Sequence, residues 1–244
     1  MKTSILLFII LIAGTACMFT SDTHNGPAKK ETRTATGFEA IRVGGAFEVT
    51  LTQSETYGLI VEAAAGLLPK IKTEVSNGVL VLSTVGDIHT DSAIRVFVSL
   101  PNLKRIDGSG ASKISCFNRL HSPELHIKSS GADQMQLETD SKNIQITLSG
   151  AGNVTLLGSC ENLEADLSGA GDLEAFRLET GKAEVYVSGA GNAQVNAQKS
   201  INGKVNGAGS ITYSGDPADK FIETNGVGTI RHTGKQAGSS EEHE

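Results

Sequence analysis

A glycine-rich pattern recurs at a nearly constant interval through the second half of the chain. Each copy begins with Ser or Asn, followed by Gly and then Ala or Val, and successive copies are about 20 residues apart. A fixed period of this length is typical of a solenoid, in which each repeat is one coil that buries its apolar face by stacking on its neighbours. The first glycines of the copies are Gly110, Gly131, Gly150, Gly169, Gly189, Gly207 and Gly226.

Apolar residues keep a constant offset from these glycines. The position four residues after the glycine is always apolar, and the position four residues before it is apolar in all copies but one. Polar and apolar residues alternate within each copy, which is the period of a β-strand. The sequence therefore predicts an all-β fold, a parallel β-helix of about 20 residues per coil with strands about 4.8 Å apart. The two columns are Ile114, Met135, Val154, Leu173, Ala193, Ile211 and Ile230, and Ile106, Ile127, Ile146, Ala165, Val185, Gly203 and Ile222.

We expect the glycine pattern to form a corner between two strands. Glycine permits φ values or a close backbone approach that a side chain would prevent, and the alanine that follows is expected to point into the core. The Ser or Asn that opens each copy is expected to form a hydrogen-bonded ladder, as stacked Asn side chains do in cross-β assemblies. The ladder would comprise Ser109, Ser130, Ser149, Ser168, Ser188, Asn206 and Asn225.

A single folded unit is predicted to span residues 37–234, with the coils confined to residues 102–234. Residues 37–101 show strand-like alternation without the repeat, and turn residues such as Gly44-Gly45 and Asn77-Gly78 separate the apolar runs. Asn-Gly between apolar runs is a strong hairpin signal. We expect antiparallel hairpins here that cap or begin the solenoid, because a terminal coil would otherwise expose an apolar edge.

Both ends of the chain differ from this unit. Residues 1–17 combine Lys2, an apolar run and small residues before Cys17, which is the pattern of a bacterial lipoprotein signal with an acylated Cys17. An ordinary secretory signal cleaved near Ala16 is the alternative. Residues 18–36 are polar and predict a flexible tether to the membrane, and residues 235–244 predict a disordered tail. We therefore expect an exported lipoprotein of the bacterial cell envelope, anchored in the outer membrane.

Composition and motif spacing argue against several kinds of site. The net charge of −6 argues against nucleic acid as a partner. Phosphate-binding glycines occur once, between a strand and a helix, whereas this pattern recurs. Calcium-binding repeats need an acidic residue in each copy, and here only Asp172 occupies that position. His89, His121, His126 and His232 show no metal-ligand spacing. We expect neither a metal nor a cofactor.

Acidic side chains are the candidates for catalysis. Glu164, Asp166, Asp172 and Glu174 lie on one predicted coil and Glu184 on the next, so two carboxylates could meet at glycosidase spacing. The chain has no Trp to stack on a sugar ring. No basic residue accompanies these acids consistently. We therefore expect no catalytic residues, with a carbohydrate-active enzyme that uses Asp166 and Asp172 as the alternative.

Two cysteines, Cys116 and Cys160, lie in the folded unit. They occupy different phases of the repeat, so their Cβ atoms are not expected to reach disulfide geometry. Both are predicted to be small buried thiols.

The chain resembles the head GIN domain family. The resemblance rests on Cys17 and its signal, on the opening segment GFEAIRVGGAFEV (37–49), on LLPKI (67–71) and on the repeated Ser-Gly-Ala-Gly, and it covers about residues 38–233. Members are described as auto-transporter adhesins and are common as exported proteins of Bacteroidetes. The resemblance implies a right-handed parallel β-helix and brings no catalytic residues with it. Likeness of fold implies function only faintly.

These observations favour a binding module. Regular coils present long flat ladders that suit extended contacts, and we expect the partner to be a glycan or a protein of the envelope or matrix. A structural or assembly role in the envelope is a further hypothesis.

Overall fold

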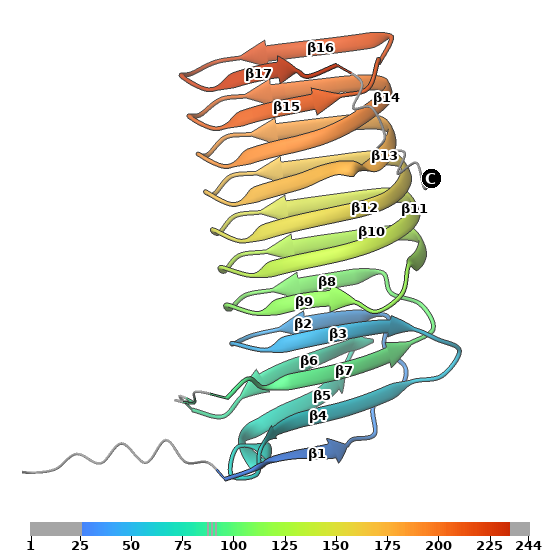
Figure 1. The fold of residues 1–244 in the computed structure, drawn as a ribbon, viewed down its shortest axis with the longest axis vertical. Helices are drawn as coiled ribbons and strands as arrows, with labels where there is room; N and C mark the ends of the chain where they lie inside the picture. The colour runs from blue at the N-terminus through green and yellow to red at the C-terminus, as the bar shows by residue number, and fades with distance from the viewer. Residues whose placement is uncertain (1–25, 87, 89, 91, 235–244) are drawn as a thin grey trace, which may run out of the picture.

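The computed structural model describes residues 26–86, 88, 90 and 92–234, and it confirms an all-β solenoid (Figure 1). Cys17 with its signal, the first part of the predicted tether, His89 and the predicted tail lie outside the described residues. Within the described part, seventeen strands and one short 3-10 helix, η1 (Leu68–Lys70), are present. The strands are β1 (Ala28–Thr32), β2 (Ala40–Val43), β3 (Glu48–Gln53), β4 (Gly58–Ala64), β5 (Ile71–Ser76), β6 (Val79–Thr84), β7 (Arg95–Leu100), β8 (Arg105–Gly108), β9 (Lys113–Cys116), β10 (Leu120–Ser129), β11 (Gln134–Leu148), β12 (Asn153–Leu167), β13 (Asp172–Val187), β14 (Asn192–Val205), β15 (Ser210–Ser214), β16 (Asp219–Thr224) and β17 (Thr229–His232).

Each coil has two faces, joined by a tight corner at one end and a wide bend at the other (Figure 1). The corner is the glycine pattern, and each of β11 to β13 runs from one corner through the bend to the next. We call the sheet that follows each corner face A and the sheet that precedes it face B. On face A, Met135 pairs with Val154, and on face B, Ile146 pairs with Ala165, both in parallel register. Equal phases of the repeat therefore lie above one another.

The two predicted apolar columns line the interior between the faces. On face A the column from Ile114 to Ile211 is at most 2% exposed, and on face B the column from Ile106 to Val185 is at most 1% exposed. Burying one such large side chain stabilises the fold by about 1.5–3 kcal/mol. Ile222, in the last coil, is 45% exposed. Each coil therefore completes its core only when the next coil covers it.

The first coil precedes the seven predicted corners. Gly44 and Gly45 do not close a hairpin: β2 pairs in parallel with β8, and β3 pairs in parallel with β9. A Cβ on Gly110 would collide with the main chain of Gly45, so the two corners stack like the later ones. The prediction of hairpins throughout residues 37–101 was therefore wrong for β2 and β3. The chain leaves this coil to build the cap and then returns, so the order of coils in the stack differs from the order in the sequence.

The cap contains the predicted hairpin. Strands β5 and β6 are antiparallel, and Ser76 pairs with Val79 across the two-residue loop. Asn77 and Gly78 have φ values of 50° and 74°, the left-handed conformations that a type I′ turn requires. Strand β4 pairs antiparallel with β1 and β7. These strands cover the N-terminal end of the stack, as Figure 1 shows.

Strand β1 lies within the predicted tether. It pairs antiparallel with β4, and the Arg33 guanidinium donates hydrogen bonds to the carbonyl oxygens of Leu68 and Ile71 at 2.8 and 2.6 Å. Ala35 is buried. All five residues of β1 are exposed, so the strand has no apolar alternation to reveal it. The prediction of a flexible tether over residues 18–36 was therefore wrong from residue 28 onward.

Candidate functional site

The first glycine of each corner is required by close backbone approach. A Cβ on Gly131, Gly150 or Gly169 would collide with the carbonyl oxygen of the first glycine in the neighbouring corner. Their φ angles lie outside the left-handed region. The Ala170 N–H donates to the Gly150 carbonyl at 3.0 Å, which closes the contact between two corners. The corner glycines therefore serve stacking, and no unusual φ is involved at these positions.

The alanine of the corner does not point inward, contrary to expectation. Ala132, Ala151 and Ala170 are not buried in the core, whereas the second glycine, as at Gly152 and Gly171, is buried. A Cβ on Gly171 would collide with the carbonyl oxygen of Gly152. The inward position of the corner therefore belongs to the second glycine.

The predicted side-chain ladder of Ser and Asn was largely wrong. Asn225 Nδ2 donates to Asn206 Oδ1 at 3.3 Å, so the two Asn residues do form one rung. The Ser130 hydroxyl instead donates to the main-chain carbonyl of Gly108 at 3.3 Å. A serine hydroxyl is too short to reach the same atom one coil away, about 4.8 Å distant.

A ladder does form four residues further on, at the start of face A. The Asn192 main-chain N–H and side-chain Nδ2 both donate to Asp172 Oδ1 at 2.9 Å, and the Ser210 hydroxyl donates to Asn192 Oδ1 at 2.7 Å. Asp172 thus ties neighbouring coils together.

Asp166 lies on face B, on the other side of the corner, and pairs there with Tyr186. Face A also carries Glu174, bonded to Thr155 at 3.3 Å. The structure therefore does not bring together Asp166 and Asp172, the two acids of the enzymatic alternative.

One buried carboxylate occupies a corner where later coils have the second glycine. Asp133 is 0% exposed. Its Oδ1 accepts hydrogen bonds from the Ser112 N–H at 3.1 Å and the Ser112 hydroxyl at 2.6 Å, and its Oδ2 accepts one from the Ser129 hydroxyl at 2.9 Å. Gly108 leaves the space for this carboxyl, because a Cβ there would collide with it. These bonds satisfy the buried group, and the cluster joins consecutive coils.

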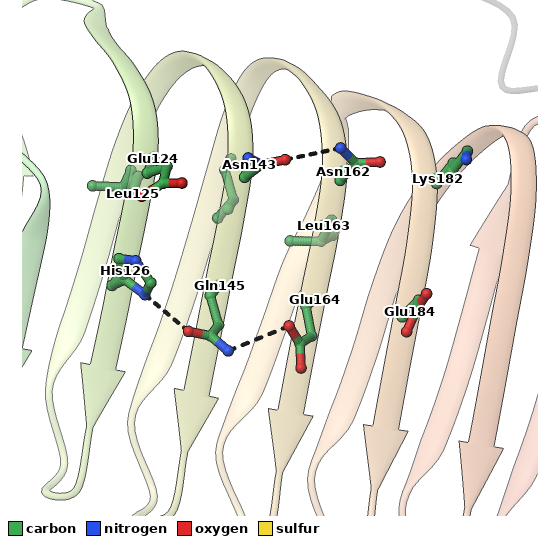
Figure 2. Close-up of a pocket in the computed structure, with 11 residues that line it drawn as sticks. Glu124, Leu125, His126, Asn143, Gln145, Asn162, Leu163, Glu164, Lys182 and Glu184 are labelled. Atoms are coloured by element: carbon green, nitrogen blue, oxygen red, sulfur yellow. Dashed lines mark hydrogen bonds between the residues drawn. The ribbon is translucent and has the colours of Figure 1, made fainter.

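A groove on face B gathers polar side chains from four successive coils (Figure 2). Its volume is about 430 Å³. Every second side chain of a strand points outward from the sheet, so each strand contributes two polar side chains to the groove. The next coil contributes two more at the same positions. We call this cavity the lateral groove. Its polar side chains are Glu124 and His126 from β10, Asn143 and Gln145 from β11, Asn162 and Glu164 from β12, and Lys182 and Glu184 from β13.

Hydrogen bonds run along the lateral groove from coil to coil. His126 Nδ1 lies 2.9 Å from Gln145 Oε1, and Gln145 Nε2 donates to Glu164 Oε2 at 3.3 Å, as Figure 2 shows. In the parallel column, Asn162 Nδ2 donates to Asn143 Oδ1 at 2.8 Å. The amides are thereby held in fixed orientations; Gln145 is exposed, and Asn143 and Asn162 are half-buried. Such a surface offers paired donors and acceptors at the coil spacing.

An ion-pair cluster lies at the bend. Arg119 bonds to Glu138 through Nε at 2.8 Å and to Asp140 through Nη1 at 3.2 Å. Partial burial raises the pKa of the Asp140 carboxyl, but hydrogen bonds from Ser159 and Arg119 outweigh this effect and hold that pKa below its usual value. The His121 Nδ1 atom lies 3.8 Å from Asp140 Oδ2. This cluster links successive coils at the surface, where such pairs contribute little to stability.

Both described cysteines are free thiols. Cys160 is buried as predicted, whereas Cys116 is only half-buried. Burial raises the pKa of both thiols. At neutral pH they are therefore mainly protonated and weakly nucleophilic.

His232 lies against an aromatic ring in the last coil. It stacks on Tyr213 with ring centroids 4.8 Å apart, and its Nε2 lies 2.8 Å from the Gly215 carbonyl oxygen.

Within the residues that the structure describes, no three His, Cys, Asp or Glu side chains are grouped so as to hold a metal ion. The described helical segment is too short to cross a membrane.

The chain belongs to the head GIN domain family. The family model, described as "Putative auto-transporter adhesin, head GIN domain", matches residues 37–217. Among curated proteins, none matches the chain.

Three solved structures show the same fold. A "putative adhesin" from Bacteroides fragilis is 25% identical, with a TM-score of 0.81, over 84% of this chain and 97% of that one. A "putative lipid binding protein" from Parabacteroides distasonis is 20% identical, with a TM-score of 0.70, over 86% and 98%. A "putative adhesin" from Parabacteroides merdae is 22% identical, with a TM-score of 0.65, over 86% and 97%. The family and these neighbours place the chain among adhesin-like β-solenoids.

Sequence reasoning missed the lateral groove and the Asp133 cluster. The groove had a detectable signal, since Gln145 and Glu164 occupy the same phase in successive repeats and are polar. The cluster had a weaker one, the replacement of the second corner glycine by Ser112 and Asp133. Neither position contains a recognised motif, so only the coil register shows what lies beside it.

Proposed function

We propose that this protein is a non-catalytic adhesin of the bacterial cell envelope and that its lateral groove binds a glycan. The observation that carries the proposal is the hydrogen-bonded array of His126, Gln145 and Glu164 on three successive coils (Figure 2). Amides and carboxylates in fixed positions recognise sugar hydroxyls by paired hydrogen bonds. The coil spacing of about 4.8 Å repeats these groups along the stack, which suits an extended polymer.

The proposal includes export and a lipid anchor on Cys17. The small residues before Cys17 and the apolar run support it. Several acyl chains on one residue would hold the protein firmly at the membrane. Within the described part of the chain, the strand nearest to this end is β1, which lies in the cap. An anchor on Cys17 would therefore tether the solenoid by its capped end.

One observation favours binding over catalysis. Asp166 and Asp172, the acids of the enzymatic alternative, lie on different faces, and Asp172 is engaged by Asn192. Glu164 and Glu184 are register neighbours on face B, so this pair is the one that a carbohydrate-active enzyme would use in the lateral groove.

The chemistry of the lateral groove also bears on the kind of ligand. The structural neighbour from Parabacteroides distasonis is described as a "putative lipid binding protein". In this chain, the apolar residues that line the lateral groove, Leu125, Ile144 and Leu163, are buried, and its exposed and half-buried lining residues are charged, amide or imidazole side chains. Such groups suit a hydroxylated ligand better than an acyl chain, because an acyl chain would bury them without hydrogen-bond partners.

A binding screen on matched variants tests this function. The full-length chain is screened on a glycan array and by co-sedimentation with polysaccharides. The double variant Gln145→Ala with Glu164→Ala removes two of the three side chains of the hydrogen-bonded array. Gln136→Ala with Glu174→Ala is the matched control, because it removes the same residue types from outward positions of face A. We expect the face B variant to lose binding by about tenfold or more and the control to bind like the wild type. Equal binding by both variants, or no binding by the wild type, would overturn the proposal.

A further inference from the structure

We propose that the cap-side end of face B holds an anion-binding pocket that takes the carboxylate or sulfate group of an acidic polysaccharide. This inference rests on the proposed function, because it specifies the chemical class of the glycan. A cavity of about 300 Å³ lies next to the lateral groove and shares His126 and Gln145 with it. Its other lining residues are Arg105, Ile127, Lys128 and Thr147. Basic and neutral side chains line this pocket, without Asp or Glu, in a chain whose net charge is −6.

A poorly exposed carboxylate holds the arginines of this region in place. The side chain of Asp107 is only 11% exposed. Its Oδ1 accepts a hydrogen bond from Arg105 Nε at 2.7 Å, and its Oδ2 accepts bonds from Arg42 Nε and Nη2 at 3.4 and 3.3 Å. Lys128 is the register neighbour of Asp107 on the next coil. Asp107 thus pairs with two arginines beside Lys128, so the three basic side chains outnumber this carboxylate.

The position of Arg105 leaves its binding groups available. Among the described residues, Asp107 is the acceptor for Arg105, and it uses Nε. The two terminal nitrogens therefore remain for a ligand, and a guanidinium binds a carboxylate or sulfate through two parallel hydrogen bonds. Because Asp107 already orders the side chain, the entropy lost on binding is reduced.

The charges along face B define how a polymer would lie. Arg105 and His126 occupy the cap side of one column, and Lys128 lies beside them in the adjacent column, whereas Glu164 and Glu184 follow in the first column beyond Gln145. An anionic substituent is attracted by Arg105 and Lys128 and repelled by Glu164 and Glu184, so this column favours a charged sugar unit at its cap-side end. Glu124 and Lys182 lie in the parallel column of the lateral groove and carry the opposite charges at the two ends. The polymer would place an acidic sugar over the pocket and neutral sugars along the groove.

Titration with defined polymers tests the pocket. The full-length chain is titrated with polygalacturonate, which carries carboxylates, with dextran sulfate, which carries sulfates, and with uncharged dextran. Arg105→Gln and Lys128→Gln each remove one cation, and Lys128→Gln leaves the Asp107 pairs intact. Lys204→Gln is the control, because Lys204 lies in the same column of face B outside the pocket and pairs with Glu223. We expect an anionic polymer to bind more tightly than dextran, each pocket variant to weaken it about tenfold, and the control to leave it unchanged.

Nuclear magnetic resonance separates this inference from the proposed function. D-galacturonate, as a small probe, is expected to shift the main-chain amide signals of residues 105, 128 and 147. Polymer binding that depends on Gln145 and Glu164 but not on Arg105 or Lys128 would overturn the pocket and leave the adhesin function standing. Shifts at the pocket without any polysaccharide binding would support the pocket and overturn the adhesin function. An unshifted pocket together with charge-independent binding would refute the inference.

Discussion

Replacing Gly169 by Ala tests the close stacking of the corners. The new Cβ would collide with the carbonyl oxygen of Gly150 and lie 2.7 Å from the carbonyl carbon of Ser149. Both are main-chain atoms, which cannot rotate away as a side chain does. The corner would have to shift, which strains the hydrogen bond from the Ala170 N–H to Gly150. Overpacking costs about 1–3 kcal/mol and a weakened hydrogen bond about 0.5–1.5 kcal/mol. We therefore expect the free energy of unfolding to fall by about 2–4 kcal/mol.

Guanidinium chloride unfolding of the full-length chain measures this loss. Circular dichroism is the appropriate signal, because the chain has no Trp. Ala170→Ser is the matched control: it changes the adjacent corner residue, which is exposed, and surface changes of this kind stay within about 0.5 kcal/mol. If Gly169→Ala unfolded at the same denaturant concentration as the wild type, the argument from backbone contact between corners would be refuted.

The buried and charged groups give three further predictions. Asp133→Ala leaves the Ser112 N–H buried without its acceptor and should cost about 1–3 kcal/mol in denaturant unfolding, whereas Asp133→Asn retains an acceptor oxygen and should cost less; equal losses would contradict this. Because the pKa of Asp140 is lowered in the folded state, its stabilising contribution should be complete above the unfolded pKa of about 3.9 and vanish as the pH falls through the lower folded value. The stability difference between the wild type and Asp140→Asn should therefore be constant at neutral pH and shrink in acid, and a difference that grew in acid would show the opposite sign. The raised pKa of Cys116 and Cys160 predicts slow alkylation by iodoacetamide at neutral pH that accelerates as the pH rises, measured by mass spectrometry; rapid modification at neutral pH would indicate a thiolate instead.

The parts of this fold that depend on regular stacking could be predicted from the sequence. The column that includes Met135 and Val154 is visible because each coil repeats the same requirement for an inward apolar side chain. The corner at Gly45 was missed because the neighbours of its coil in the stack come much later in the sequence: β2 lies between β6 and β8. Strand β1 was missed because hydrogen bonding to β4, and not burial, holds it.

The site was less predictable than the fold. Asp166 and Asp172 are close in sequence, but the corner between them directs them to different faces. Conversely, His126 and Glu164 are distant in sequence, and the coil register places both beside Gln145. Proximity in a solenoid follows phase within the repeat, and a sequence does not state in advance which outward phase forms a groove.

Hydrogen exchange of the full-length chain with its captured glycan tests the central claim most directly. Mass spectrometry compares exchange with and without the glycan in segments 124–128, 143–147 and 162–166 of face B and in segments 134–138, 153–157 and 172–176 of face A. Binding in the lateral groove predicts slower exchange in the face B segments and unchanged exchange in the face A segments. Protection confined to face A or to the last coil, with face B unchanged, would contradict the account.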